Sequence, residues 1–176
     1  SVNEDRNTLV YKLNEVIDIP KKLNEYFDEI LDTKYYIFGV PTIDSFFYSI
    51  LYVIHKDFKL KDKQVRQDYV DKLKKEINTK LPDHFKKSSQ FKLYCYKIND
   101  IRENVLDSNK VREGLLCYMA NYFNINLVII DYENERYWTG REYDDSINEN
   151  NVVLLYSNGR YLPLIHIYGD LPDNFI

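Results

Sequence analysis

Apolar residues recur at helical spacing in the first two thirds of the chain and alternate at strand spacing in the last third. The pattern predicts helices over residues 7–17, 20–32, 45–55, 63–80 and 109–123. It predicts strands over residues 35–40, 125–130, 137–138, 151–156 and 161–167, and a hairpin turn over 157–160. The stretch 83–106 fits either short helices or turns. Helices followed by a mainly antiparallel sheet predict an α+β fold.

Three residues set the expected ends of these helices. Pro20 separates the first two helices and suits the first turn of the second. Pro82 lies just beyond the expected end of the helix over 63–80, because proline interrupts a helix. Ser108 is a favourable N-cap for the helix that begins at residue 109.

Length and composition predict one globular domain over residues 1–176. The chain is 44% hydrophobic and 30% charged, which is ordinary for such a domain. We expect a helical N-terminal part over about 1–34 and a core over about 35–170. Since the chain starts at Ser1 and its one methionine is Met119, we expect a domain cut from a longer protein.

The charge and the cysteine content limit the classes of binding partner and the cellular compartment that we expect for this chain. A net charge of −4 argues against a nucleic-acid partner, which needs a basic face. No apolar run approaches the roughly 20 residues that span a bilayer, so no membrane partner is expected. Cys95 and Cys117 lie in apolar or aromatic settings and are expected to be free thiols, which favours the cytoplasm. The bias toward Lys, Asn, Ile and Tyr suggests a viral or bacterial source, and hence a host cytoplasm. The pattern does not determine an oligomeric state.

A papain-like catalytic site needs a nucleophile at the N-terminus of a buried helix. The helix dipole and the free backbone N–H groups there stabilise a thiolate and later an oxyanion. Such a site also needs a histidine that the fold brings in from a distant strand. Ser45 begins the first strongly apolar helix after a loop, and His166 lies near the end of the last strand. These two residues are therefore the candidate pair.

The same stretch resembles the ovarian-tumour (OTU) family of cysteine proteases. That family opens its catalytic helix with Asp-Gly-Asn-Cys-Phe/Leu-Phe, and this chain reads Thr-Ile-Asp-Ser-Phe-Phe over residues 42–47. A helix, an apolar strand, a hairpin and a closing strand with the histidine follow in the family's order. The resemblance covers about residues 35–170 and implies a papain-like, OTU-like α+β fold.

The resemblance also implies a function and a set of roles. The function is that of a deubiquitinase, a thiol isopeptidase that removes ubiquitin or a ubiquitin-like modifier without a cofactor or metal. Position 45 would be the nucleophile and His166 the general base and acid. The oxyanion hole would be formed by the backbone N–H groups of Thr42, Ile43, Asp44 and Ser45.

Three positions depart from the family pattern. Ser45 replaces the cysteine, Thr42 replaces an aspartate, and Tyr168 stands where an Asn or Asp usually orients the imidazole. Asp170 or Asp44 would have to orient the histidine instead. Because a serine hydroxyl is far less acidic than a thiol, we expect little or no protease activity.

This substitution has two explanations. Ser45 is either an engineered change that inactivates a deubiquitinase or a natural loss. In the second case the chain is a pseudo-protease, a protein-binding module of a viral or bacterial polypeptide.

Plainer interpretations stay open beside these. Ser45 is also compatible with an ordinary residue at the start of a helix, with Asp44 as its cap. Cys95 is an alternative nucleophile, with His84 or His166 as its base, although no loop-to-helix transition precedes it. The spacing of the histidines and cysteines matches no zinc ligand set. Finally, the chain could be a structural α+β domain whose likeness to the family is accidental.

Overall fold

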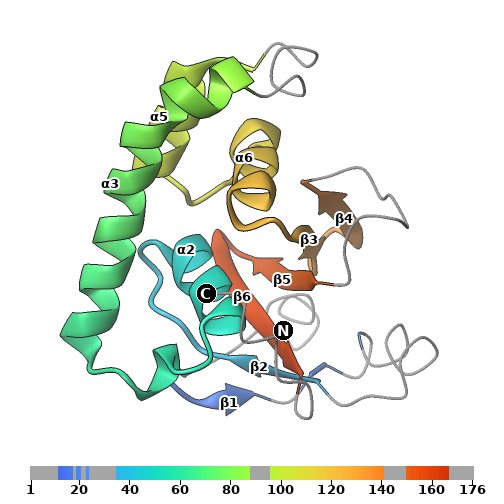
Figure 1. Cartoon of the computed structure of the whole chain (residues 1–176). Coiled ribbons are helices and arrows are strands. Elements are labelled where there is room, and N and C mark those ends of the chain that lie inside the picture. The colour runs from blue at the N-terminus through green and yellow to red at the C-terminus, as the bar shows by residue number, and fades with distance from the viewer. Residues whose placement is uncertain are drawn as a thin grey trace.

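The computed structural model describes residues 12–17, 19–20, 23, 35–87, 96–140 and 150–166, except the side chain of His166. Figure 1 shows the order of the elements along the chain. The helices are α2 (Ser45–Ile54), the 3-10 helix η1 (Phe58–Leu60), α3 (Lys63–Lys87), α5 (Ile98–Leu106) and α6 (Glu113–Phe123). The strands are β1 (Val16–Ile17), β2 (Tyr35–Phe38), β3 (Asn126–Asp131), β4 (Arg136–Thr139), β5 (Asn151–Ser157) and β6 (Arg160–His166).

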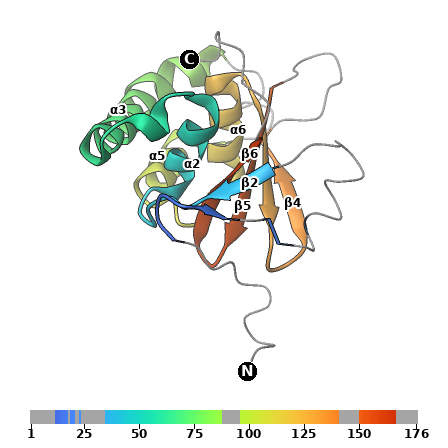
Figure 2. The ribbon, with the colours of Figure 1, turned by 90° about the horizontal axis from the view of Figure 1, so that it is seen from below.

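The strands form one six-stranded sheet in the order β1-β2-β6-β5-β3-β4. The pair β3 and β5 is parallel, and the other neighbouring pairs are antiparallel. The four α-helices of the described part of the chain lie on one side of this sheet (Figure 2). The predicted α+β class, with helices on a mainly antiparallel sheet, is therefore confirmed.

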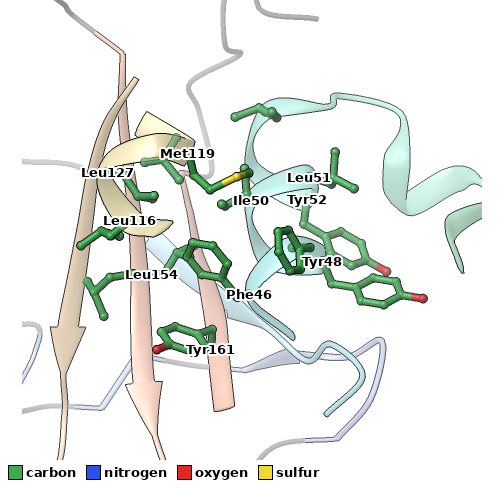
Figure 3. Packing of buried hydrophobic residues seen from close by; sticks show 14 of the residues in the cluster. Phe46, Tyr48, Ile50, Leu51, Tyr52, Leu116, Met119, Leu127, Leu154 and Tyr161 are labelled. Atoms are coloured by element: carbon green, nitrogen blue, oxygen red, sulfur yellow. The ribbon is translucent and has the colours of Figure 1, made fainter. Parts of the chain in front are cut away.

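The hydrophobic core fills the space between α2, α6 and the covered face of the sheet (Figure 3). Phe46 and Ile50 of α2 and Met119 of α6 are completely buried there. They pack with the alternate residues of β3 and β5 that point inward, such as Leu127 and Leu154. This alternation is the period-two pattern from which the strands were predicted.

The predictions for the central and C-terminal strands are confirmed. β2, β3, β4, β5 and β6 lie where the pattern placed them, within one or two residues at most ends. The hairpin between β5 and β6 turns at Asn158 and Gly159, whose φ angles are 51° and 74°. Asparagine and glycine tolerate these left-handed angles best, which explains why this pair marks the turn.

The prediction of a helix over 7–17 is wrong where the structure describes that segment. Residues 12–15 form a turn, and Val16 and Ile17 pair with Phe38 and Ile37 as β1. Strand pairing at the sheet edge therefore overrides the helical spacing of a few apolar residues. Residue 23 is helical and Pro20 is not, and the rest of the predicted helix 20–32 lies outside the described residues.

Helix α3 continues to Lys87, so the prediction that Pro82 lies beyond the helix is wrong. Proline has no N–H to donate to the carbonyl four residues earlier, here that of Asn78. The guanidinium of Arg102, from α5, donates to this carbonyl at 3.3 Å. A neighbouring helix thus compensates for part of the loss, which helps α3 pass through the proline.

Helix α6 begins at Glu113, four residues later than predicted, and Ser108 is buried and not its cap. The side chain of Asn104 explains the delay. It donates to the carbonyls of Asp107 and Lys110 and accepts from the N–H of Arg112. These three hydrogen bonds hold the segment before α6 as a loop.

Candidate active site at the start of helix α2

Ser45 is the first residue of α2 and is only 3% exposed. The preceding residue, Asp44, has a φ of 60°, so the chain turns sharply from the loop into the helix. The carboxylate of Asp44 forms an ion pair at 2.9 Å with Lys74 of α3. The predicted start of a buried helix at Ser45, directly after a loop, is therefore confirmed.

The hydroxyl of Ser45 hydrogen-bonds to the backbone of the sheet. Its Oγ accepts a hydrogen bond from the N–H of Tyr161 at 2.9 Å. One helical turn later, the Oγ of Ser49 donates to the carbonyl of the same Tyr161 at 3.0 Å. Residues four apart lie on the same face of a helix, so the two serines bind both polar groups of one residue.

The position of β2 explains why Tyr161 needs these two partners. The described pairing of β2 with β6 runs from His166 to Leu164, three residues beyond Tyr161. On the β2 side, Tyr161 therefore has the serines of α2 as partners where the strand pairing has ended. Buried backbone groups without partners are costly, so this arrangement gives both serines a structural role.

Tyr161 is also held by its side chain. Its ring packs edge-on against Phe46, with ring centroids 5.3 Å apart. Its phenol oxygen accepts a hydrogen bond at 2.7 Å from the N–H of Val111, in the loop before α6. Burial raises the pKa of this phenol. Tyr161 thus joins the sheet, α2 and the loop before α6, and its phenol is not a base at neutral pH.

His166 lies at the other end of β6 from Ser45. Its backbone pairs with Tyr35 at the start of β2. It is five residues beyond Tyr161, and at about 3.3 Å per residue this separates the two backbones by about 16 Å. The side chain of His166 lies outside the described residues. The structure therefore brings the backbones of Ser45 and Tyr161 together, and not those of Ser45 and His166.

The other two histidines serve different parts of the fold. His55 follows the last residue of α2, ten residues from Ser45, which corresponds to about 15 Å along a helix. The Nδ1 atom of His84 lies 2.8 Å from the hydroxyl of Tyr118. Within the described part of the chain, the partner of the Ser45 hydroxyl is a backbone N–H and not an imidazole or a carboxylate.

The remaining predicted site residues lie in different surroundings. Thr42 and Ile43 are in the exposed loop before α2, with Ile43 78% exposed. The carboxylate of Asp44 is occupied by Lys74 and so is directed to α3. Asp170, Tyr168 and Cys95 lie outside the described residues. Cys117 is a buried free thiol, as the sequence predicted, and burial raises its pKa.

Comparisons with known proteins do not assign this chain to a family. No protein-family model matches the chain, and no curated protein matches it. Among the described residues, no group of three or more His, Cys, Asp or Glu side chains could hold a metal ion. In the same part of the chain, no helix is both long and apolar enough to cross a membrane.

The sequence analysis missed the roles of Ser49 and Tyr161. The sequence did contain a pattern that pointed to them. Residues 45–54 are apolar or aromatic except for two serines, which lie four residues apart. Two small hydroxyls on one face of a buried helix indicate a shared polar partner. The identity of that partner could not be read from the sequence, because it is the backbone of a residue 112 positions from Ser49.

Proposed function

We propose that this chain is a protein-binding domain with the layout of an OTU-type protease, in which position 45 stabilises the fold and does not catalyse. The hydrogen bond from the N–H of Tyr161 to the Ser45 hydroxyl carries this proposal. A nucleophilic serine must be reached by the substrate and must give its proton to an aligned base. Ser45 is buried, and its oxygen is already an acceptor.

The residues at the start of β6 support the same conclusion. A base that β6 supplies to Ser45 would have to come from this end of the strand, where Arg160 and Tyr161 stand. An arginine stays protonated in proteins. The pKa of the Tyr161 phenol is raised by burial. Neither side chain can accept the serine proton at neutral pH.

The proposed partner is ubiquitin or a ubiquitin-like protein, and it comes from the resemblance over residues 35–170. The cellular location that we propose for this binding is the cytoplasm of a host cell. A cleft that no longer cuts would still hold the partner, as expected for a natural pseudo-protease.

The second candidate function is an active deubiquitinase when position 45 is cysteine. One observation favours it: position 45 opens a buried helix behind a left-handed residue, where backbone N–H groups are free to stabilise an anion. This candidate requires His166 to reach position 45 by a rearrangement of β6.

The two functions are separated by the variant Ser45→Cys, treated with ubiquitin that carries a thiol-reactive group at its C-terminus. We expect no adduct beyond that of the unchanged chain. Ser49→Cys is the matched control, since it places a second buried thiol on the same face of α2. An adduct specific to Cys at position 45 and lost on His166→Ala would establish the deubiquitinase and overturn the proposal.

Binding is measured separately by titrating the isotope-labelled, unchanged chain with ubiquitin and recording its amide spectrum. Saturable shifts without an adduct would support the proposal. Neither shifts nor an adduct, with the fold intact, would remove ubiquitin as the partner.

A further inference from the structure

A groove of about 430 Å³ lies between α3 and α5, and one of its lining residues, Lys74, is the ion-pair partner of Asp44. The two helices lie side by side in both views of the molecule (Figures 1 and 2). The groove is lined by Asp71, Lys74, Lys75, Asn78, Leu81, Arg102, Val105 and Leu106.

The apolar part of the groove combines buried side chains with one exposed leucine. Leu81 and Val105 are buried, and Leu106, the last residue of α5, is 80% exposed. A leucine this exposed beside a hollow with apolar residues could lose a large apolar area to a bound side chain. Such removal of apolar surface from water drives binding.

Most of the charged side chains in the groove are cationic, whereas the chain as a whole carries a net negative charge. Three are cationic and one, Asp71, is anionic, whereas the net charge of the chain is −4. Asp71 accepts a hydrogen bond from Gln67, and Lys74 is paired with Asp44. Lys75 and Arg102 have no carboxylate partner among the described residues. The groove therefore favours an anionic ligand.

Arg102 is the cation of the groove whose position is fixed by a contact with α3. Its terminal nitrogen donates to the carbonyl of Asn78, which Pro82 leaves without its helical partner. Its Nε is buried and has no hydrogen-bond partner in the described part of the chain. Because this Nε is closed to solvent, a carboxylate of a ligand would meet the terminal nitrogens of the guanidinium, a group that binds carboxylates well.

We propose that this groove binds an acidic segment of a partner protein that also carries a leucine-like side chain. The apolar side chain would pack on the exposed Leu106, at the mouth of the hollow that the buried Leu81 and Val105 line, and neighbouring carboxylates would meet Lys75 and Arg102. The inference rests on the proposed function in that the domain acts by binding. It assigns a second surface, the groove between α3 and α5, and gives that surface an acidic partner segment.

The test uses a short fluorescent peptide in which leucines are spaced among glutamates, with binding followed by fluorescence anisotropy. Two further peptides replace the leucines by serine or the glutamates by lysine. We expect saturable binding of the first peptide alone, weakened by added salt because the rim charges are exposed to solvent. Equal binding of the serine peptide, or full competition by inorganic phosphate, would reduce the groove to a simple anion site and overturn the proposal.

Matched variants locate the binding. Lys75→Glu should weaken binding by about tenfold, which corresponds to about 1.4 kcal/mol. Lys72→Glu makes the same charge change on the same helix, at an exposed residue outside the groove, and should have a much smaller effect. Arg102→Met should weaken binding at least as strongly as Lys75→Glu. Equal effects of the two lysine variants, or no binding at all, would also overturn the proposal.

Failure of this inference and failure of the proposed function give different results. Absence of an adduct with Ser45→Cys, together with ubiquitin binding, would leave the protein-binding function standing even if the peptide fails to bind. If the adduct forms and the peptide still binds at Lys75, the groove is a docking surface of an enzyme.

Discussion

At both the junction of α2 with β6 and the groove between α3 and α5, side chains bind backbone groups that lack a regular hydrogen-bond partner, but the two regions differ in what their side chains leave unpaired. At the junction, the two serines of α2 bind both backbone groups of Tyr161. In the groove, Arg102 binds the carbonyl that Pro82 leaves free, and neither Arg102 nor Lys75 has a carboxylate partner among the described residues. A polar side chain whose partners are all internal stabilises the fold, whereas a cation at a groove without a carboxylate partner is available for an anionic ligand.

The largest expected contrast comes from removing apolar side chains in the two regions. Phe46 is completely buried and packs on Tyr161, so Phe46→Ala should lower the free energy of unfolding by about 3–5 kcal/mol. Leu106→Ala, in the exposed part of the groove, should change it by no more than about 0.5 kcal/mol. Chemical denaturation measures both. Similar losses would mean that Leu106 is covered within the fold.

The second contrast concerns the two serines. Ser49→Ala and Ser45→Ala should each cost about 1–3 kcal/mol, because each leaves one buried group of Tyr161 without its partner. The double variant should differ from the sum of the two, since both act on one residue. Losses below about 0.5 kcal/mol for both single variants would show that the serines do not stabilise the junction.

A third, smaller effect is expected at Pro82. Pro82→Ala returns an N–H to α3, which should stabilise the helix, although part of the gain is lost to the freer unfolded chain. We expect a net gain of about 1 kcal/mol, and a weaker contact of Arg102 with the Asn78 carbonyl. The free energy of unfolding gives the first result. A loss of stability would show that the proline ring is itself well packed.

The smallest effect is a dependence on pH that arises at neither region. Burial and the nearby Lys61 lower the pKa of His55. Below the ordinary pKa of about 6.5, the unfolded chain therefore binds more protons at this residue than the folded chain. Stability should fall slightly as the pH drops from 7.5 to 6, and less so in His55→Gln. An unchanged slope in that variant would assign the effect to other groups.

The parts of the fold that could be predicted are those that local pattern determines. The central helix and the strands of residues 126–166 follow from apolar periodicity and from the Asn-Gly turn. The errors at residues 16–17, at Pro82 and before Glu113 share a physical cause. In each, a distant or side-chain partner (Phe38, Arg102 or Asn104) overrides the local preference.

In the candidate site, too, the local pattern could be predicted from the sequence and the distant partner could not. The position of Ser45 at the start of a buried helix could be predicted from the apolar run that follows it. The partner of its hydroxyl could not, because that depends on where β2 stops pairing with β6. The sequence therefore indicated the right helix terminus, while the role of the serine emerged from the register of the sheet.

The most direct test of the role of position 45 is the pKa of a thiol placed there. In Ser45→Cys, the pKa is measured from the rate of alkylation against pH, with the rate of the unchanged chain subtracted. Burial raises the pKa of such a thiol, whereas the helix N-terminus and the N–H of Tyr161 lower it. With no cationic imidazole beside it, the thiol should have the same pKa in Ser45→Cys and in the double variant that adds His166→Ala. A pKa below about 7 that returns to the ordinary value on His166→Ala would contradict the account and show a histidine-paired active site.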